Sequence, residues 1–357
     1  MKRFLLVVSV VVLLLLAVGV ALRVPITMRL MERVVATNMA SSLLDDLPDG
    51  LHLLLCGAGS PLPDPKRSGP CVAVVAGDRL FVVDSGSGAS RVMSRTRLPQ
   101  GRIEAVLLTH FHSDHIDGLG EVMMQRWANG GHSKPVPVYG PTGVARVVDG
   151  LNEAYALSRA GRVAHHGEDV VPASGAGGVA RPFPVPAEGR DEVVLDEGGV
   201  RITAFLVDHA PVRPAVGYRF DHAGRSLVIS GDTVKSANLA RAAQGVDLLV
   251  HEALDPELVA VLTRAARQAG RERLAKITTD ILDYHASPED AAETARDVGA
   301  GHLLLYHIVP PLLLGPMEDV FADGVAGIYP GPFTIGRDGT LVRLPAGSDR
   351  IEVDELL

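Results

Sequence analysis

The chain has 357 residues, a formal net charge of −8 at neutral pH and a sequence pI near 5.9. This length is sufficient to bury one large or two moderate hydrophobic cores. An acidic chain with only 4% aromatic residues and no Lys/Arg run interleaved with aromatics lacks the positive face of a typical nucleic-acid-binding protein. A local basic patch is still compatible with these numbers.

The N-terminal segment has the composition of a membrane-crossing helix. Two cations, Lys2 and Arg3, precede an uncharged apolar run from Phe4 to Leu22. Nineteen residues in a helix span about 28 Å, close to the thickness of the hydrocarbon core. We expect the two cations to stay in the cytoplasm and the rest of the chain to lie on the extracytoplasmic side. The alternative is a signal peptide that is cleaved after Gly19–Ala21, which would release a secreted protein.

The two cysteines, Cys56 and Cys71, flank a loop of turn-forming residues, "GAGSPLPDPKRSGP". In a segment that is exported from the cytosol, this arrangement favours a disulfide. Closing a loop of fourteen intervening residues would stabilise the fold by roughly 3 kcal/mol on the loop-entropy model. Two separate buried thiols are the alternative interpretation.

From Leu51 onward, strand and helix patterns alternate. The expected strands are 51–56, 71–77, 79–86, 103–108, 136–140, 192–199, 200–209, 215–224, 225–233, 246–253 and 302–308. The expected helices are 90–97, 118–127, 143–160, 235–244, 264–282 and 287–300. Residues 161–190, rich in Gly, Pro and Ala, are expected to form a surface excursion. This mixture predicts two sheets with helices on their outer faces.

Directly after the apolar strand 103–108, the stretch "THFHSDHIDGLG" concentrates histidines and aspartates. His110 and His112 are two residues apart, and Asp114 and His115 begin the turn into the next helix. A lone histidine is ordinarily a surface or core residue, but four such side chains in one loop exceed what a core requires. Imidazole and carboxylate together suit zinc or a similar divalent ion.

Further ligands are expected at other strand ends, where a polar residue follows an apolar run. His209 ends "LVDH", Asp232 ends "VISGD" and His307 ends "LLLYH". An open metal site between the ends of strands would need donors at these positions.

This pattern resembles the metallo-β-lactamase superfamily over about residues 51–345, and the HxHxDH signature at His110–His115 is highly specific to it. The resemblance implies an α/β fold, an αββα four-layer sandwich, with two Zn²⁺ ions (Mn²⁺ or Fe²⁺ as alternatives) at one edge of the sheets. By that resemblance the metal ligands are His110, His112 and His209 for one ion, Asp114, His115 and His307 for the other, and Asp232 as the bridge.

Secondary motifs resemble the ribonuclease Z and arylsulfatase-like branch. They include the third-motif residues of "DHAPVRPAVGYRF", the stretch "VHEAL" and the triplet "HAS". The resemblance implies catalytic roles for three residues: Asp114 as proton acceptor beside its ligand role, His285 as proton donor to the leaving oxygen, and Glu252 as the group that orients His285. The competing interpretation places His285 at a helix flank and Glu252 in strand-end packing.

The predicted function is an exported, membrane-anchored, zinc-dependent binuclear hydrolase. It would hydrolyse phosphodiester or sulfate esters through a metal-bridging hydroxide. The alternatives are a lactonase or β-lactamase-type hydrolase, a non-catalytic metal-binding protein and a di-iron redox protein. We expect a small-molecule ester substrate and no tRNA, because only 22 residues separate His209 from Asp232, too few for a long tRNA-binding arm, and an exported domain would not meet tRNA precursors. A homodimer is a possible assembly.

Four segments are expected along the chain. They are residues 1–25 as membrane anchor or signal, 26–50 as a helical linker, 51–345 as the hydrolase domain and 346–357 as a C-terminal tail.

Overall fold

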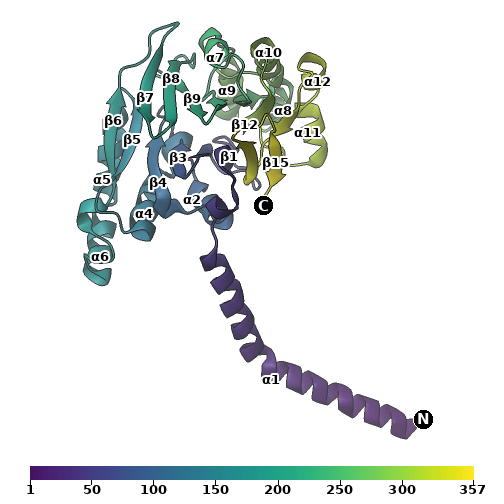
Figure 1. Ribbon diagram of the computed structural model, residues 1–357. Helices are drawn as coiled ribbons and strands as arrows, with labels where there is room; N and C mark the ends of the chain where they lie inside the picture. The colour runs from purple at the N-terminus through teal and green to yellow at the C-terminus, as the bar shows by residue number, and fades with distance from the viewer. The chain divides into compact units, whose positions relative to one another are not determined.

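The computed structural model describes all 357 residues and divides them into two compact units, Met1–Asp46 and Leu47–Leu357. The first unit consists of α1 (Lys2–Ala40) and a 3₁₀ turn at Leu43–Asp46. Helix α1, purple in Figure 1, continues through Pro25 to Ala40, so the expected anchor and the first part of the expected linker 26–50 form one helix. None of its side chains is buried, and it is long and apolar enough to cross a membrane.

The second unit contains two β-sheets. The first sheet has eight strands in the order β15-β14-β1-β2-β3-β4-β5-β6, and the second has seven in the order β13-β12-β11-β10-β9-β8-β7. The strands of the first sheet are β1 (Gly50–Gly57), β2 (Cys71–Ala76), β3 (Arg79–Val83), β4 (Ile103–Leu107), β5 (Val136–Pro141), β6 (Gly178–Phe183), β14 (Thr340–Pro345) and β15 (Glu352–Glu355). Those of the second are β7 (Asp191–Glu197), β8 (Val200–Leu206), β9 (Val216–His222), β10 (Arg225–Ile229), β11 (Leu248–Leu254), β12 (His302–Val309) and β13 (Phe333–Ile335).

The main hydrophobic core lies between the two sheets. It joins residues of β1–β4 to residues of β8–β12, as in the pair of Phe81 and Phe220, whose ring centroids are 6.1 Å apart. All eight residues of β1 and all eight of β12 are buried. Continuous apolar runs of this kind are expected for strands that are covered on both faces.

Helices cover the outer faces of both sheets (Figure 1). On the first sheet and its loops lie α2 (Ala89–Arg95), α3 (Ser113–Ile116), α4 (Leu119–Gly130), α5 (Val144–Ala154) and α6 (Ala156–His166). The helices on the side of the second sheet are α7 (Ala237–Ala242), α8 (Pro256–Gln268), α9 (Glu272–Asp280), α10 (Pro288–Val298), α11 (Gly315–Phe321) and α12 (Val325–Ile328). A second core cluster joins β11 and β12 to α7, α10 and the α11–α12 segment. These layers confirm the predicted αββα sandwich.

Several segments differ from the sequence-based expectation. The helix expected at 143–160 is divided into α5 and α6, and β13 and β14 follow the last expected strand, 302–308. The excursion 161–190 contains β6, a strand that is buried only at its two ends and forms by pairing in parallel with β5. The helix expected at 264–282 is replaced by α8 and α9, which are separated at Gly270, where φ is +68°. The expected tail 346–357 contributes β15, which pairs with β14 and places Asp354 beside Arg343.

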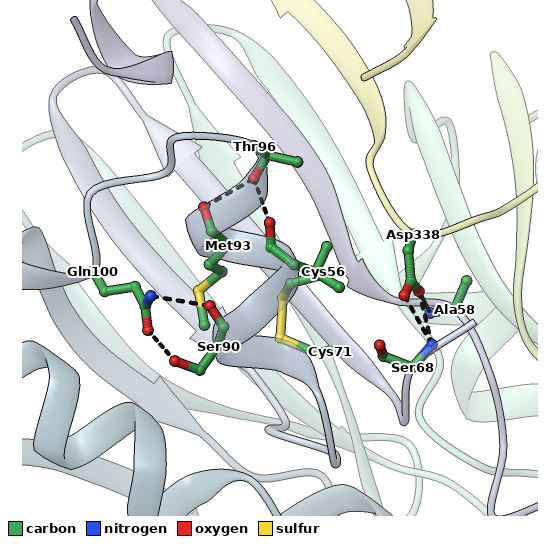
Figure 2. The surroundings of a disulfide bond; sticks show 10 residues. Cys56, Ala58, Ser68, Cys71, Ser90, Met93, Thr96, Gln100 and Asp338 are labelled. Carbon is green, nitrogen blue, oxygen red and sulfur yellow. Dashed lines mark hydrogen bonds between the residues drawn. A yellow bond between two sulfur atoms is a disulfide. The ribbon is translucent and has the colours of Figure 1, made fainter. Parts of the chain in front are cut away.

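A disulfide joins Cys56 to Cys71, as the loop composition predicted (Figure 2). The two residues lie on the neighbouring antiparallel strands β1 and β2, with Cα atoms 4.9 Å apart. The loop that they close is also held by Asp338, whose carboxylate accepts hydrogen bonds from the backbone N–H of Ala58 and Ser68 at 3.2 and 2.9 Å.

Candidate metal centre

One edge of the sandwich collects the ends of several strands that run in the same direction. Strand β4 is parallel to β3, and β10, β11 and β12 are parallel to one another. Strand β8 has the same direction as β10, because both are antiparallel to β9. The segments that follow these strands therefore meet at one edge, where donors far apart in the sequence come together.

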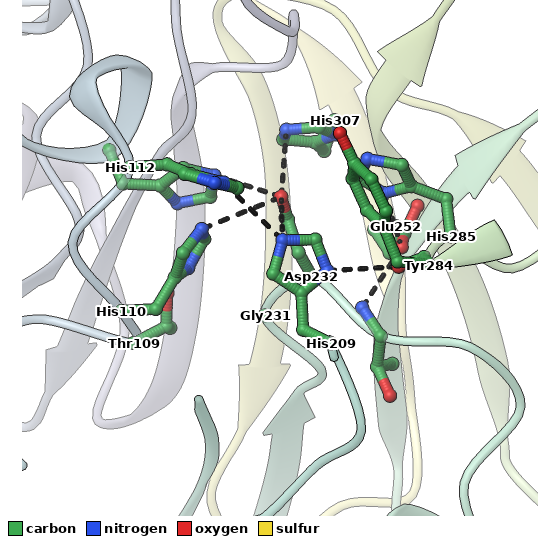
Figure 3. Close-up of polar contacts among 12 residues, drawn as sticks. Thr109, His110, His112, His209, Gly231, Asp232, Glu252, Tyr284, His285 and His307 are labelled. Atoms are coloured by element: carbon green, nitrogen blue, oxygen red, sulfur yellow. Dashed lines mark hydrogen bonds and ion pairs between the residues drawn. The ribbon is translucent and has the colours of Figure 1, made fainter. Parts of the chain in front are cut away.

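The structure brings the seven predicted ligands together in two groups. Five of them are labelled in Figure 3: His110, His112, His209, Asp232 and His307. Within each group, the candidate donor atoms lie within 4.8 Å of one another. The first group consists of His110, His112, His209 and Asp232, and the second of Asp114, His115 and His307. The grouping agrees with the two ligand sets that the resemblance implied.

Asp232 lies between the two groups. Its Oδ2 atom is 3.8 Å from Nε2 of His110 and 3.9 Å from Nε2 of His209, both in the first group. The same oxygen is 3.3 Å from Nε2 of His115 and 3.3 Å from Nε2 of His307, both in the second group. A single buried carboxylate oxygen that faces four imidazole nitrogens has the position of a bridging ligand.

Most charges of the centre fit a bound cation. His115 is the exception, because burial would lower its pKa but the carboxylates of Asp232, Asp84 and Asp114 raise it well above the usual value. Burial lowers the pKa of His110 well below its usual value, which favours the neutral imidazole that a metal requires. Burial alone would raise the pKa of Asp232, but His115 and His307 hold it well below the usual range, so the carboxylate stays ionised. The buried Nε2 atoms of His110 and His115 and Oδ1 of Asp232 have no hydrogen-bond partner. Imidazole nitrogens and carboxylate oxygens in this mixture suit zinc.

Asp84, which follows β3, orients His115 from behind. Its Oδ2 accepts a hydrogen bond from Nδ1 of His115 at 2.8 Å and another from the Thr109 hydroxyl at 2.7 Å. Its Oδ1 accepts the backbone N–H of Thr109 at 2.9 Å. Such a contact to the outer imidazole nitrogen turns the inner nitrogen toward the metal. The sequence analysis included Asp84 in the expected strand 79–86 and did not reveal this role.

Tyr284 supports His209 in the same way and was missed by the sequence analysis. Its backbone carbonyl accepts a hydrogen bond from Nδ1 of His209 at 2.9 Å, and the two rings pack edge to face. A backbone carbonyl carries no residue-specific signal, so no sequence pattern could have identified this contact.

His285 and Glu252 form a buried pair beside the centre (Figure 3). Nδ1 of His285 donates a hydrogen bond to Oε1 of Glu252 at 2.8 Å, and the same oxygen accepts the backbone N–H of Thr233 at 3.0 Å. Burial acts to lower the pKa of His285, but the charge and hydrogen bond of Glu252 outweigh it and raise the pKa to about 9. The His285 ring stacks on that of His307 at 5.4 Å. The predicted pair is thus assembled at the site, and its catalytic role stays a prediction.

A cavity of about 260 Å³ opens over these groups. Polar donors form its floor, among them Asp114, Asp232 and His285. Its wall is apolar and comes mainly from α9 and the turn after it, through Ile277 and Ile281.

Two facing sheets with a buried histidine–aspartate cluster at one edge define a metal-dependent hydrolase of the αββα type. Residues 79–308 match the family model described as a beta-lactamase superfamily domain. The chain belongs to this superfamily and has the metallo-β-lactamase fold.

Relatives with established names cover most of the chain. Ribonuclease Z of Mycolicibacterium gilvum (strain PYR-GCK) is 38% identical over 272 residues, which are 75% of this chain and 88% of that protein. Ribonuclease Z of Mycobacterium avium (strain 104) is 35% identical over 300 residues, 84% of this chain and 100% of that protein. Among solved structures, the short form of human tRNase Z superposes with a TM-score of 0.58 at 22% identity, covering 82% of this chain and 99% of that one.

These relatives overturn the expectation of a small-molecule ester substrate without tRNA. That expectation is wrong because proteins named ribonuclease Z share the domain at 35–38% identity. It relied on two arguments: the short segment between His209 and Asp232, and the expected export of the domain, which the comparisons do not show. The M. avium protein aligns with this chain over its full length within 300 residues, so a domain of this size occurs under that name. The length of the segment therefore does not exclude tRNA.

Proposed function

We propose that this chain is a ribonuclease Z-type phosphodiesterase that cleaves RNA, with tRNA as the substrate class indicated by the names of its relatives. The observation that carries the proposal is the position of Asp232. Its Oδ2 lies 3.3–3.9 Å from four imidazole nitrogens that belong to two separate groups of donors. Such an arrangement suits two divalent ions that share one carboxylate.

The residues that would hold two Zn²⁺ ions are His110, His112 and His209 for one, Asp114, His115 and His307 for the other, and Asp232 for both. When bound there, a pair of divalent ions would supply Lewis acidity, activate water at neutral pH and stabilise the charge of a phosphoryl group.

The protein's own groups handle the protons. His285 has its pKa raised to about 9, so it carries a proton at neutral pH and can donate it to a leaving oxygen. Glu252 holds the ring in position through the hydrogen bond to Nδ1, which leaves Nε2 as the donating atom. Asp114, which lines the cavity, has a second role as proton acceptor.

A protonated His285 favours substrates whose leaving group needs a proton. A ribose oxygen released from RNA is strongly basic and benefits from such a donor. The sulfate esters predicted from the arylsulfatase-like motifs and the lactones of the alternative prediction serve as comparison substrates.

We also propose that α1 anchors the chain and that the hydrolase unit lies on the extracytoplasmic side, where it would act on tRNA and other RNA that reach that compartment. Lys2 and Arg3 before the apolar run support this orientation, and the disulfide Cys56–Cys71 fits an oxidising compartment. A reporter fused after residue 40 is expected to be active outside the cytoplasm. A reporter that is active only in the cytoplasm would contradict the orientation and leave the RNA-cleavage proposal unaffected.

The enzymatic proposal is tested with the full chain purified in detergent without chelator. Bound metal per chain is measured beside the hydrolysis of a tRNA precursor, bis-p-nitrophenyl phosphate, p-nitrophenyl sulfate and a lactone, with Asp114→Ala as the inactive control. We expect two zinc ions per chain and metal-dependent cleavage of both phosphodiesters. Turnover of the sulfate or the lactone without cleavage of RNA would refute the proposed substrate class.

A further inference from the structure

A cluster of cations lies at the tip of the helical hairpin formed by α8 and α9. We call the residues 264–276 the basic tip. In this acidic chain it carries one acidic residue, Glu272, against five exposed cations: Arg264, Arg267, Arg271, Arg273 and Lys276. The chain as a whole has 42 acidic and 34 basic residues, so this local balance is the reverse of the average.

Most of these cations form no ion pair within the chain. Lys276 pairs with Asp280 one helical turn away at 2.6 Å, but none of the four arginines has a carboxylate within ion-pair distance. Arg264 and Arg267 are three residues apart on α8 and therefore neighbours on its surface. Like charges so placed repel each other, so these arginines do not stabilise the folded chain. The cluster is thus available to an anionic partner.

The basic tip is connected to the metal centre by a groove. The cavity over the centre shares three lining residues, Leu62, Leu274 and Thr278, with an adjoining groove of about 510 Å³. The lining of that groove includes Arg271. Along α9 and the turn after it, the eight residue steps from Ile281 at the cavity back to Arg273 correspond to about 12 Å of helix.

We propose that the basic tip binds the phosphates of the RNA strand that leads away from the cleaved bond. This inference rests on the proposed function and assigns a path to its substrate. The apolar lining of the groove, such as Val261 and Ala265, suits the faces of unstacked bases, while Arg271 and Arg273 meet the phosphates. Guanidinium groups are well suited to phosphate because their donors form a planar fork.

The position of the tip favours RNA over a bilayer as its partner. Leu274, the residue next to Arg273, lines the cavity of the metal centre, and Arg271 lines the adjoining groove.

The test compares two double variants of the full chain in detergent. Arg271→Gln with Arg273→Gln removes two charges from the basic tip. The control, Arg102→Gln with Lys134→Gln, removes two exposed charges that precede β4 and β5 at the opposite edge. For each protein, kcat/KM is measured on a structured RNA substrate and on bis-p-nitrophenyl phosphate over a range of salt concentrations.

We expect the tip variant to lose about tenfold in kcat/KM on RNA at moderate salt, with the log–log salt slope reduced by about 1.4, or ~0.7 per phosphate contact. Its activity on bis-p-nitrophenyl phosphate should equal that of the wild type, which shows that the centre is intact. The control variant should keep the wild-type RNA activity and slope.

Two failures are distinguishable. A wild-type chain that hydrolyses bis-p-nitrophenyl phosphate but not RNA refutes the proposed function. A wild type that cleaves RNA, together with a tip variant of unchanged kcat/KM and slope, overturns the present inference alone and assigns the tip to another anionic partner, such as a bilayer surface. An equal loss in both double variants would overturn it as well, since the effect would then be one of net charge.

Discussion

Replacing Asp84 with asparagine tests how strongly the centre depends on a carboxylate that is not itself a proposed ligand. Asp84 is 1% exposed and binds His115 and Thr109 through three hydrogen bonds of 2.7–2.9 Å. Its φ of 57° lies in the left-handed region, which asparagine tolerates better than other non-glycine residues. The substitution therefore keeps the backbone and removes only the charge and one acceptor.

The expected loss follows from the hydrogen bond to His115. In the variant, an amide NH₂ that cannot accept replaces either Oδ2, which faces Nδ1 of His115 and the Thr109 hydroxyl, or Oδ1, which faces the Thr109 N–H. Loss of such an orienting partner lowers metal affinity by about 10–100-fold, or roughly 1.4–2.7 kcal/mol. Asp84→Ala should cost the fold about 1 kcal/mol more, because alanine is strained at this φ.

The assay is competition between the protein and a chromophoric chelator for zinc, with thermal unfolding of the metal-free chain as a check of the fold. Asp255→Asn is the matched control. Asp255 is also buried and accepts a backbone N–H, from Leu258 at 2.9 Å, but it contacts no histidine. Unchanged zinc affinity in Asp84→Asn, or the same loss in the control, would refute the reasoning.

Three further predictions concern other parts of the chain. His285→Ala should lower kcat by about 100-fold or more with metal content unchanged; metal loss would contradict its role as proton donor. Burial lowers the pKa of His302 to about 4, so the unfolded state takes up its proton first as the pH falls. The free energy of unfolding, measured by urea titration, should therefore decline by up to about 3 kcal/mol between pH ~6.5 and ~4. The His302→Gln variant should show a shallower decline over the same pH range. An identical decline in the variant would exclude His302 as its source. Replacing Cys56 and Cys71 with serine should lower that free energy by roughly 3 kcal/mol and abolish its response to reductant; a variant as stable as the wild type would show that the disulfide does not stabilise the fold.

Much of the centre was predictable from local patterns. The spacing of His110, His112, Asp114 and His115 after an apolar strand places four donors in one loop, whatever the rest of the fold does. His209 and Asp232 were found because each ends an apolar run. In a sandwich with parallel strands, such positions meet at one edge, so local periodicity was sufficient to identify them.

The substrate prediction failed because it relied on quantities that do not describe the folded surface. Net charge is an average over the whole chain, and the length of one segment describes only that segment. Recognition of a polyanion depends instead on where charges lie on the surface. The prediction of residues 264–282 as a single helix likewise concealed a hairpin whose tip gathers cations.

Composition and motif spacing by themselves determined the apolar N-terminal helix, the sandwich class, the disulfide pair and the histidines and aspartates that gather at the candidate metal centre. Only the tertiary structure decided that one oxygen of Asp232 faces four imidazoles, and that Asp84 and the carbonyl of Tyr284 hold His115 and His209. The physical reason is separation along the chain. Asp84 is 31 residues from His115 and Tyr284 is 75 from His209, so these contacts arise from the packing of whole sheets and not from any local pattern.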